Sequence, residues 1–119
     1  MTANELRIGN YVNDRLHRKV VIKEIREEHL IFYLSNGNKI KHNIKTFNPI
    51  QITNQLLLNL GFEKLIGWDD MVYFNNNGIH IYFCGNHLED WFEYENEIVI
   101  KSIHQLQNLY FSLTGKELE

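Results

Sequence analysis

The chain has 119 residues, of which 44% are hydrophobic and 23% charged, the proportions of an ordinary folded domain. This composition excludes wholesale disorder, and the apolar runs are strand-length, far short of a membrane span. The net charge of −3 conceals an asymmetry: residues 1–50 carry nine Lys/Arg against five Asp/Glu, whereas residues 51–119 carry three against ten. The first part is therefore basic (+4) and the second acidic (−7), which bears on partners rather than on fold.

The cysteine content and the first residues of the chain indicate the cellular compartment of the protein. Cys84 is the only cysteine, so no internal disulfide can form and a zinc site would have at most one thiolate. The start, Met-Thr-Ala-Asn-Glu-Leu-Arg, has no apolar stretch typical of a secretory signal. We therefore expect a cytoplasmic protein without a membrane segment.

Short strand patterns fill the basic part. Arg7–Asn13 reads as the first strand, and Lys19–Arg26 and His29–Ser35 follow it. Asn36-Gly37 then predicts a hairpin into Lys39–Ile44, because both residues tolerate the positive φ that a type I′ turn requires. Together these strands predict a strand-rich segment that is either a small SH3-like barrel or a strongly bent meander.

A short helix is expected after Pro49. Thr53 stands where an N-cap is needed ahead of Asn54–Leu60, and Gly61 falls at the position after the helix end. Leucine at positions 56, 57, 58 and 60 makes this helix apolar over most of its surface, so we expect it to be buried.

A second antiparallel sheet is predicted beyond this helix. Met71–Phe74 and Ile79–Phe83 flank a second Asn-Gly hairpin, and Trp91–Tyr94 and Glu97–Ile100 supply one or two further strands.

The last element is an amphipathic helix. Ser102 and Gln105 form a capping-box pattern, and Gly115 lies just past the helix end. We expect a single α+β domain, residues 1–119, with this helix packed on the second sheet. Two sub-domains, a basic β segment (1–50) and an acidic α+β segment (51–119), are the alternative. The apolar stripe of the helix consists of Ile103, Leu106, Leu109, Tyr110 and Leu113.

Catalytic and metal-binding patterns are absent from the sequence. His80, Cys84 and His87 are the closest approach to a metal site, and His80 and Cys84 fall on one face of a strand, but the further ligands that zinc needs are not present at a recognisable spacing. His104 lies off the apolar stripe of the last helix, so we expect it to face solvent. No nucleophile stands in a recognisable motif, and we therefore expect no enzymatic activity and no cofactor.

The basic part is the first candidate partner surface. Binding to a phosphate backbone needs clustered cations, and aromatic side chains can stack on unpaired bases. Glu24, Glu27 and Glu28 interrupt the cluster, and alternating charges on exposed strand faces are the simpler interpretation. The candidate nucleic-acid contacts, with RNA among the ligands considered, are Arg15, Arg18, Lys19, Lys23, Lys39 and Lys41.

An acidic and aromatic stretch near residue 90 is the second candidate surface. In a strand, Phe92 and Tyr94 would point to one side and Trp91 with its acidic neighbours to the other. Such a face would suit a basic protein surface, with Trp91 as the anchor; the alternative is a solvated face with Trp91 under a loop. Phe111, off the stripe of the last helix, is a further candidate contact. The predicted face consists of Glu89, Asp90, Trp91, Glu93, Glu95 and Glu97.

Three stretches stand out as a set. They are Thr2-Ala-Asn-Glu-Leu-Arg-Ile-Gly-Asn-Tyr-Val12, Pro49-Ile-Gln-Ile-Thr-Asn-Gln-Leu-Leu-Leu-Asn-Leu-Gly-Phe62 and His104-Gln-Leu-Gln-Asn-Leu-Tyr-Phe-Ser-Leu-Thr-Gly-Lys-Glu-Leu118. Together they resemble a family of short, uncharacterised bacterial and prophage proteins, with Gln51 where relatives tend to have proline. The resemblance implies no catalytic residues, but it does imply a mobile-element setting, in which small proteins often bind a host or defence protein.

From these observations we expect a non-enzymatic phage or prophage accessory protein that acts by binding a protein. Its most concrete form is an inhibitor of a host defence effector such as an RNA-guided CRISPR nuclease, that is, an anti-CRISPR. An acidic, aromatic face would match the basic channel in which such an effector holds nucleic acid. The alternative is a small nucleic-acid-binding protein that uses the basic segment.

Overall fold

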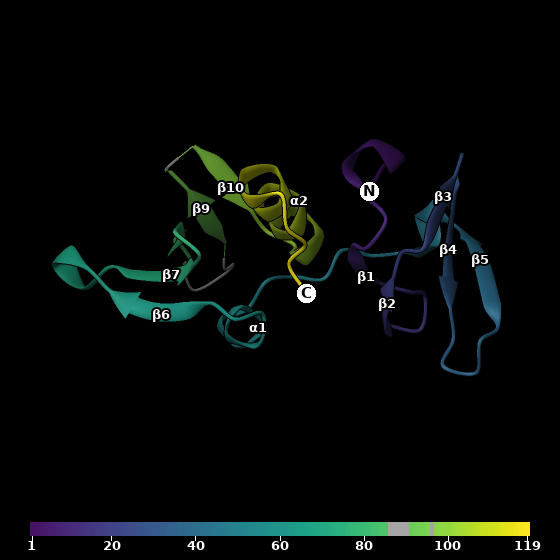
Figure 1. The fold of residues 1–119 in the computed structure, drawn as a ribbon, viewed down its shortest axis with the longest axis horizontal. Coiled ribbons are helices and arrows are strands. Elements are labelled where there is room, and N and C mark those ends of the chain that lie inside the picture. The colour runs from purple at the N-terminus through teal and green to yellow at the C-terminus, as the bar shows by residue number, and fades with distance from the viewer. Residues whose placement is uncertain (86–90, 96) are drawn as a thin grey trace. The chain divides into compact units, whose positions relative to one another are not determined.

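The computed structural model describes residues 1–85, 91–95 and 97–119, and it confirms the α+β class. Antiparallel strands form three sheets, and the chain ends in a helix (Figure 1). The chain divides into two compact units: residues 1–50 with 102–117, and residues 51–101 with 118–119. The final helix thus belongs to the unit that contains the basic segment, whereas the sequence placed it on the second sheet. Within the described ranges, no helix has the length and apolar character that crossing a membrane requires.

The first unit contains five short strands in two sheets. Strands β1 and β2 form one antiparallel pair, and β3, β4 and β5 form the other sheet in that order. An isolated antiparallel bridge joins Asn13 to Asn48, so the end of the segment returns to its first strand. The predicted strand-rich segment is therefore a bent meander that closes on itself. The bounds are β1 Tyr11–Asn13, β2 Lys19–Val21, β3 Glu24–Arg26, β4 His29–Tyr33 and β5 Lys39–Asn43.

Two strand predictions in this unit are too long. Arg7–Asn13 begins with a turn at Ile8–Gly9, where Gly9 has a φ of 98°, and only Tyr11–Asn13 is strand. The predicted strand Lys19–Arg26 is split: Ile22 bonds to the backbone of Asn10, and Lys23 N donates to the carbonyl of Ile31 at 2.9 Å. The chain changes pairing partner at this point, so the single predicted strand forms β2 in one sheet and β3 in the other.

Burial in the first unit follows from this bend. Side chains from all five strands and from the flanking 3₁₀ segments η1 (Ala3–Glu5) and η2 (Ile44–Thr46) meet in one hydrophobic cluster. Phe32 and Phe47 meet edge to face, with ring centroids 5.9 Å apart. The buried members are Leu6, Val12, Ile22, Leu30, Phe32, Ile44 and Phe47.

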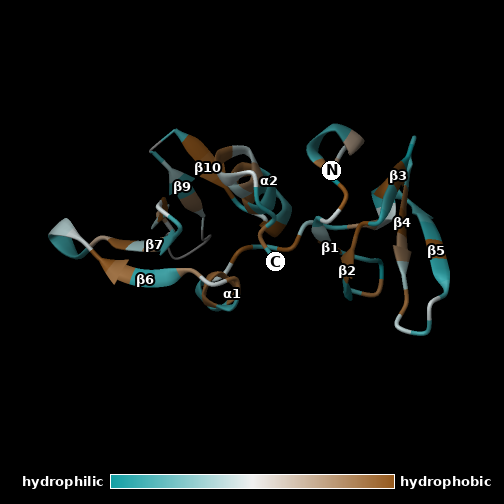
Figure 2. Cartoon of the chain, viewed as in Figure 1, coloured by the Kyte–Doolittle hydropathy of each residue, from teal (hydrophilic) through white to brown (hydrophobic). Residues whose placement is uncertain are grey.

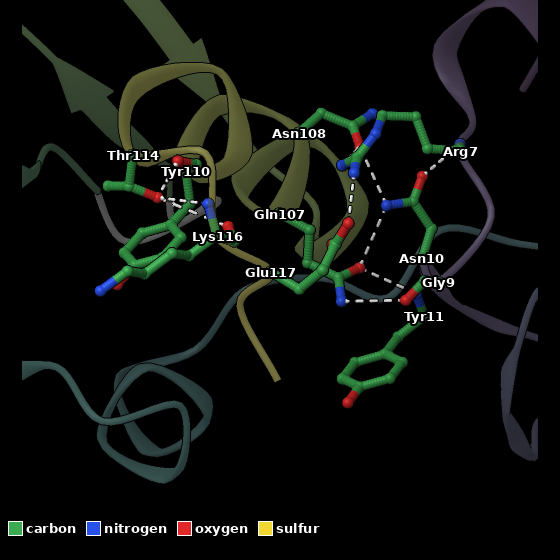
Figure 3. Close-up of polar contacts among 10 residues, drawn as sticks. All are labelled: Arg7, Gly9, Asn10, Tyr11, Gln107, Asn108, Tyr110, Thr114, Lys116 and Glu117. Carbon is green, nitrogen blue, oxygen red and sulfur yellow. Dashed lines mark hydrogen bonds and ion pairs between the residues drawn. The ribbon is translucent and has the colours of Figure 1, made fainter.

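Polar side chains join helix α2 (Ile103–Thr114) to the N-terminal segment of the same unit (Figure 3). Asn10 and Gln107 are both buried, and the Asn10 amide nitrogen donates to Asn108 Oδ1 at 2.9 Å. The guanidinium group of Arg7 lies over the Phe111 ring, 4.0 Å from its centroid, and donates to Asn108 and Glu117. Phe111 thus packs on a cation of its own chain.

Two predictions about α2 need correction. Leu113 is 46% exposed, although the sequence assigned it to the buried stripe. His104 is buried, although the sequence placed it in solvent, and its ring is 3.2 Å from the Ser102 hydroxyl and 3.4 Å from a Glu5 carboxylate oxygen. The helix buries a polar side as well as an apolar side because the first residues of the chain cover it. The capping-box bond from Ser102 N to Gln105 Oε1, 3.2 Å long, is present as expected.

The second unit begins with helix α1 (Asn54–Asn59). Thr53 Oγ1 accepts from Leu56 N at 3.2 Å, which confirms the predicted N-cap. Gly61, with a φ of 89°, and buried Phe62 bond back to Leu58 and Leu57 in a Schellman motif. The helix is less buried than predicted: only Leu57 is fully covered and Leu58 is 44% exposed, in line with the mixed hydropathy of α1 (Figure 2).

A five-stranded antiparallel meander, in the order β10-β9-β8-β7-β6, forms the rest of the second unit. Strand β6 was not expected from the sequence; the other four correspond to predicted strands. The inner face carries aromatic residues in contact: Phe92 lies 6.0 Å from Phe74 and 5.5 Å from Phe83 between ring centroids. The bounds are β6 Glu63–Ile66, β7 Val72–Asn76, β8 Ile79–Phe83, β9 Phe92–Tyr94 and β10 Ile98–Ile100, with the 3₁₀ segment η3 (Trp68–Asp70) before β7.

Both Asn-Gly pairs form hairpins, but with different turns. Asn77 and Gly78 have φ values of 51° and 83°, so this turn has the positive φ at both positions that type I′ needs. In the first hairpin only Gly37 has a positive φ. Gly37 N donates to Leu34 O, and Leu34 N donates to Asn38 O. This is a three-residue loop with a glycine bulge, which corrects the type I′ prediction there.

Candidate functional site

A groove in the first unit brings together part of the predicted basic surface. Its volume is about 390 Å³, and it lies between residues 18–23 around β2 and residues 32–35 at the end of β4. Phe32 is buried beneath it and Tyr33 is 48% exposed at its edge. The lining residues are Arg18, Lys19, Val20, Val21, Lys23, Phe32, Tyr33, Leu34 and Ser35.

Arg18 is held in place by a buried carboxylate. Its Nε donates to Asp14 Oδ2 at 2.8 Å, and Asp14 also accepts from the backbone nitrogens of Leu16 and Arg18. Desolvation acts to raise the pKa of Asp14, but the hydrogen bonds from Arg18 and Leu16 outweigh it and hold that pKa below its usual value. Asp14 therefore stays ionised and fixes the turn between β1 and β2 that carries Arg18.

Two lysines complete the cationic side of the groove. Lys19 and Lys23 are exposed, and Lys19 Nζ lies 4.3 Å from the centroid of the Tyr11 ring, a cation–π distance. Neither has an ion-pair partner within the part of the chain that the structure describes. No carboxylate among the described residues therefore neutralises either lysine.

The other three basic candidates lie outside the groove lining. Lys39 pairs in register with Tyr33 across β4 and β5, but its Nζ is 3.4 Å from a Glu24 carboxylate oxygen that also approaches Arg26. Lys41 lies on β5 and is exposed, and Arg15 is exposed in the turn before β2. The structure thus gathers Arg18, Lys19 and Lys23 and separates the rest.

The predicted acidic and aromatic face does not form as a single strand face. Glu89 and Asp90 lie outside the described residues. Trp91 is half-buried, and its carbonyl accepts from Cys84 N at 2.9 Å. Strand β9 ends at Tyr94, and Glu95, with a φ of 53°, and exposed Glu97 belong to the turn that follows. A turn interrupts the alternation on which the prediction relied.

Glu93 has a hydrogen-bond partner on the neighbouring strand end. The Cys84 thiol donates to Glu93 Oε2 at 3.2 Å. Burial, with this hydrogen bond and the nearby carboxylate charge, raises the pKa of the Cys84 thiol to about 11. A thiol with such a pKa is protonated at neutral pH and is a poor nucleophile or metal ligand. In the described ranges, no three His, Cys, Asp or Glu side chains gather as a metal site would need; His87 lies outside them.

Sequence reasoning missed an exposed aromatic group in the second unit. Trp68, not Trp91, is the exposed tryptophan, with 91% of its surface accessible. It borders a pocket of about 370 Å³ with Tyr73, His80 and Tyr82. The sequence does contain a signal for this group, because successive side chains of a strand point to opposite faces of the sheet. Tyr73 therefore points away from the face that carries buried Phe74, and His80 and Tyr82 point away from the face that carries buried Ile81.

Comparison with known proteins finds no matching family model, no matching curated protein and no matching solved structure. The groove of the first unit and the aromatic pocket of the second are the two candidate sites.

Proposed function

We propose that the protein binds single-stranded nucleic acid through the basic groove of its first unit. One observation carries the proposal: Arg18, Lys19 and Lys23 border the same groove as the half-exposed ring of Tyr33. The first unit has a net charge of +4, because Lys116 and Glu117 add no net charge to residues 1–50.

The chemistry of the groove favours a single strand. Cations neutralise backbone phosphates, and an exposed tyrosine ring can stack on a base only if that base is unpaired. With three phosphates neutralised, the logarithm of the binding constant should fall by about 2 for each tenfold rise in salt. The short lining predicts a site for a few nucleotides with little sequence preference.

Fluorescence anisotropy with labelled single-stranded DNA and RNA, from low to moderate salt, tests this proposal. We expect binding by the native chain and its loss in the double variant Lys19→Glu, Lys23→Glu. The matched control is Lys45→Glu, Lys116→Glu, which makes the same charge change in the same unit at exposed lysines outside the groove. Absence of any complex at low salt, or an equal loss in both double variants, would contradict the proposal.

Protein binding by the acidic second unit is the second candidate function. The observation that favours it is the exposure of Trp68 beside Asp69 and Asp70, in a unit with a net charge of −7. A surface of this kind suits a basic partner. The family resemblance supplies the phage setting, in which the concrete role is inhibition of a defence effector such as an RNA-guided nuclease. Cleavage assays with a purified nuclease, with and without the protein, test that role; unchanged cleavage at excess protein excludes it for that nuclease.

A further inference from the structure

The pocket of the second unit is lined mainly by aromatic rings. Tyr73 and Tyr82 are paired in register on β7 and β8, with ring centroids 5.7 Å apart, and the His80 ring lies 5.4 Å from Tyr73. Gly67 and Met71 complete the lining with Trp68. The π-faces in this cluster present partial negative charge.

The loop before β7 holds Trp68 away from the core. Gly67 N donates to Met71 O at 2.8 Å, and Met71 N donates to Trp68 O at 3.1 Å, which closes the loop on itself. Asp69 and Asp70 both have left-handed φ values, 55° and 58°, a conformation that non-glycine residues adopt infrequently. The loop therefore keeps a large apolar ring in solvent although burial would stabilise it.

Close packing links this loop to the pocket wall. A Cβ atom at Gly67 would lie 3.3 Å from Tyr73 Cε1, tighter than an ordinary contact, so the absence of a side chain lets the loop approach the tyrosine ring. The backbone that leads into Trp68 therefore lies close against the Tyr73 ring.

Charge decides which ligand suits the pocket. Asp69 and Asp70 directly follow Trp68 in sequence, and Glu93 pairs in register with Tyr82 on the next strand. The unit as a whole carries two lysines against nine acidic residues. A negative field repels phosphates and favours cations, and aromatic faces bind cations through their quadrupole.

We infer that this pocket binds a cationic side chain, arginine or lysine, of a basic polypeptide partner. The inference deepens the second candidate function, on which its choice of a protein partner rests. Trp68 and Tyr82 supply the aromatic faces, and Asp69 and Asp70 supply the charge that attracts the cation.

A pair of peptides isolates the role of the cation. The full-length protein, labelled with ¹⁵N, is titrated with a short arginine-containing peptide and with the same peptide carrying citrulline, which has nearly the same shape without the charge. We expect the arginine peptide to shift the indole N–H resonance of Trp68 and the amides of Tyr73 and Tyr82, and the citrulline peptide to bind roughly tenfold more weakly or not at all.

Variants then test the pocket itself. Trp68→Leu keeps an apolar side chain without the ring, and Asp69→Asn with Asp70→Asn removes charge with a residue that tolerates left-handed φ. Both should weaken arginine binding several-fold. Ile66→Ala is the control, since Ile66 is 69% exposed on the neighbouring strand but does not line the pocket.

Three outcomes would overturn the inference: equal binding of the arginine and citrulline peptides, unchanged affinity in Trp68→Leu, or shifts of the pocket resonances by a single-stranded oligonucleotide instead of the peptide. Failure of the wider protein-binding function looks different. In that case the arginine peptide still shifts the pocket resonances, while no nuclease is inhibited.

Discussion

The side chain of Gln107 hydrogen-bonds the backbone around Tyr11 as a neighbouring strand would. Its Oε1 accepts from Tyr11 N at 2.8 Å, and its Nε2 donates to Gly9 O at 3.3 Å (Figure 3). The amide group thus satisfies one donor and one acceptor of the segment that enters β1. A helix near the end of the chain is thereby bonded to the backbone at the start of the first strand.

Several contacts join the first residues of the chain to its last helix and the residues just after it. The stretch from Thr2 to Val12 and the stretch from His104 to Leu118 meet through Gln107, Asn108 and the Arg7–Phe111 stack. These side chains are therefore occupied in holding the first unit together. The groove and the aromatic pocket are lined by residues outside both of these stretches.

Replacing Gln107 with leucine should destabilise the protein by about 2–4 kcal/mol, because the part-buried Tyr11 N–H and Gly9 C=O would lose the hydrogen bonds that the buried Gln107 amide supplies. Chemical denaturation with urea measures the change in the free energy of unfolding. Gln55→Leu is the control, since Gln55 is exposed and bonds only to exposed Asn59 among the contacts described. Equal stability of the Gln107→Leu variant and the native chain would show that the amide is dispensable.

Stability should also fall as the pH is lowered from about 7 to 5, because of His104. Desolvation lowers the pKa of His104, and the hydrogen bond to Glu5 opposes this only in part. The folded state therefore binds this proton less readily than the unfolded state, whose histidine pKa is about 6.5. The contribution of His104 to the free energy of unfolding is fully present above that value. It decreases as the pH falls toward the lower pKa of the folded state.

Thermal unfolding of the native chain and of His104→Gln, recorded at pH 7.5 and pH 5, measures this contribution. The difference in melting temperature between the two pH values should be smaller in the variant. Glu5 does not obscure the result, because a backbone hydrogen bond from Thr2 lowers its pKa and places its titration below this window. His17→Gln, at an exposed position, should retain the native pH response; the same response in His104→Gln would contradict the prediction.

The Cys84 thiol should react slowly with alkylating reagents at neutral pH. With a pKa of about 11, the thiolate is roughly 100-fold rarer than in a free cysteine. Iodoacetamide labelling at pH 7.5, followed by mass spectrometry, measures the rate. Glu93→Gln removes the carboxylate that disfavours the thiolate and should accelerate labelling, whereas a native rate equal to that of a free thiol would contradict the raised pKa of Cys84.

Tyr33→Ala should weaken single-strand binding by about 1–3 kcal/mol without altering its salt dependence, because stacking contributes affinity and releases no counterions. Anisotropy titrations at several salt concentrations separate the two effects. Tyr33→Phe keeps the ring and should bind as the native chain does. A shallower salt slope in Tyr33→Ala would mean that the tyrosine acts by positioning the cations rather than by stacking.

Local chemistry in the sequence was enough to predict most of the elements. The Thr53 cap, the left-handed glycine after α1 and the Asn77-Gly78 turn each depend on residues a few positions apart. Strand β6 was missed, because its pattern, Glu63–Ile66, shows no clear alternation of buried and exposed residues. Leu58 was overestimated as a core residue for a related reason: composition indicates an apolar helix but not which side is covered.

Contacts between distant residues required the tertiary structure. His104 is buried because Glu5, 99 positions away, lies against it, and no local period encodes that contact. Lys19 and Lys23 reach the same groove as Tyr33 because the chain changes sheets at Ile22, and Trp68 borders Tyr82 because of the register of β7 and β8. The sequence by itself determined residue types, turns and caps, which depend on neighbours along the chain. The tertiary structure decided which of them meet, because bends and strand register follow from packing of the whole unit.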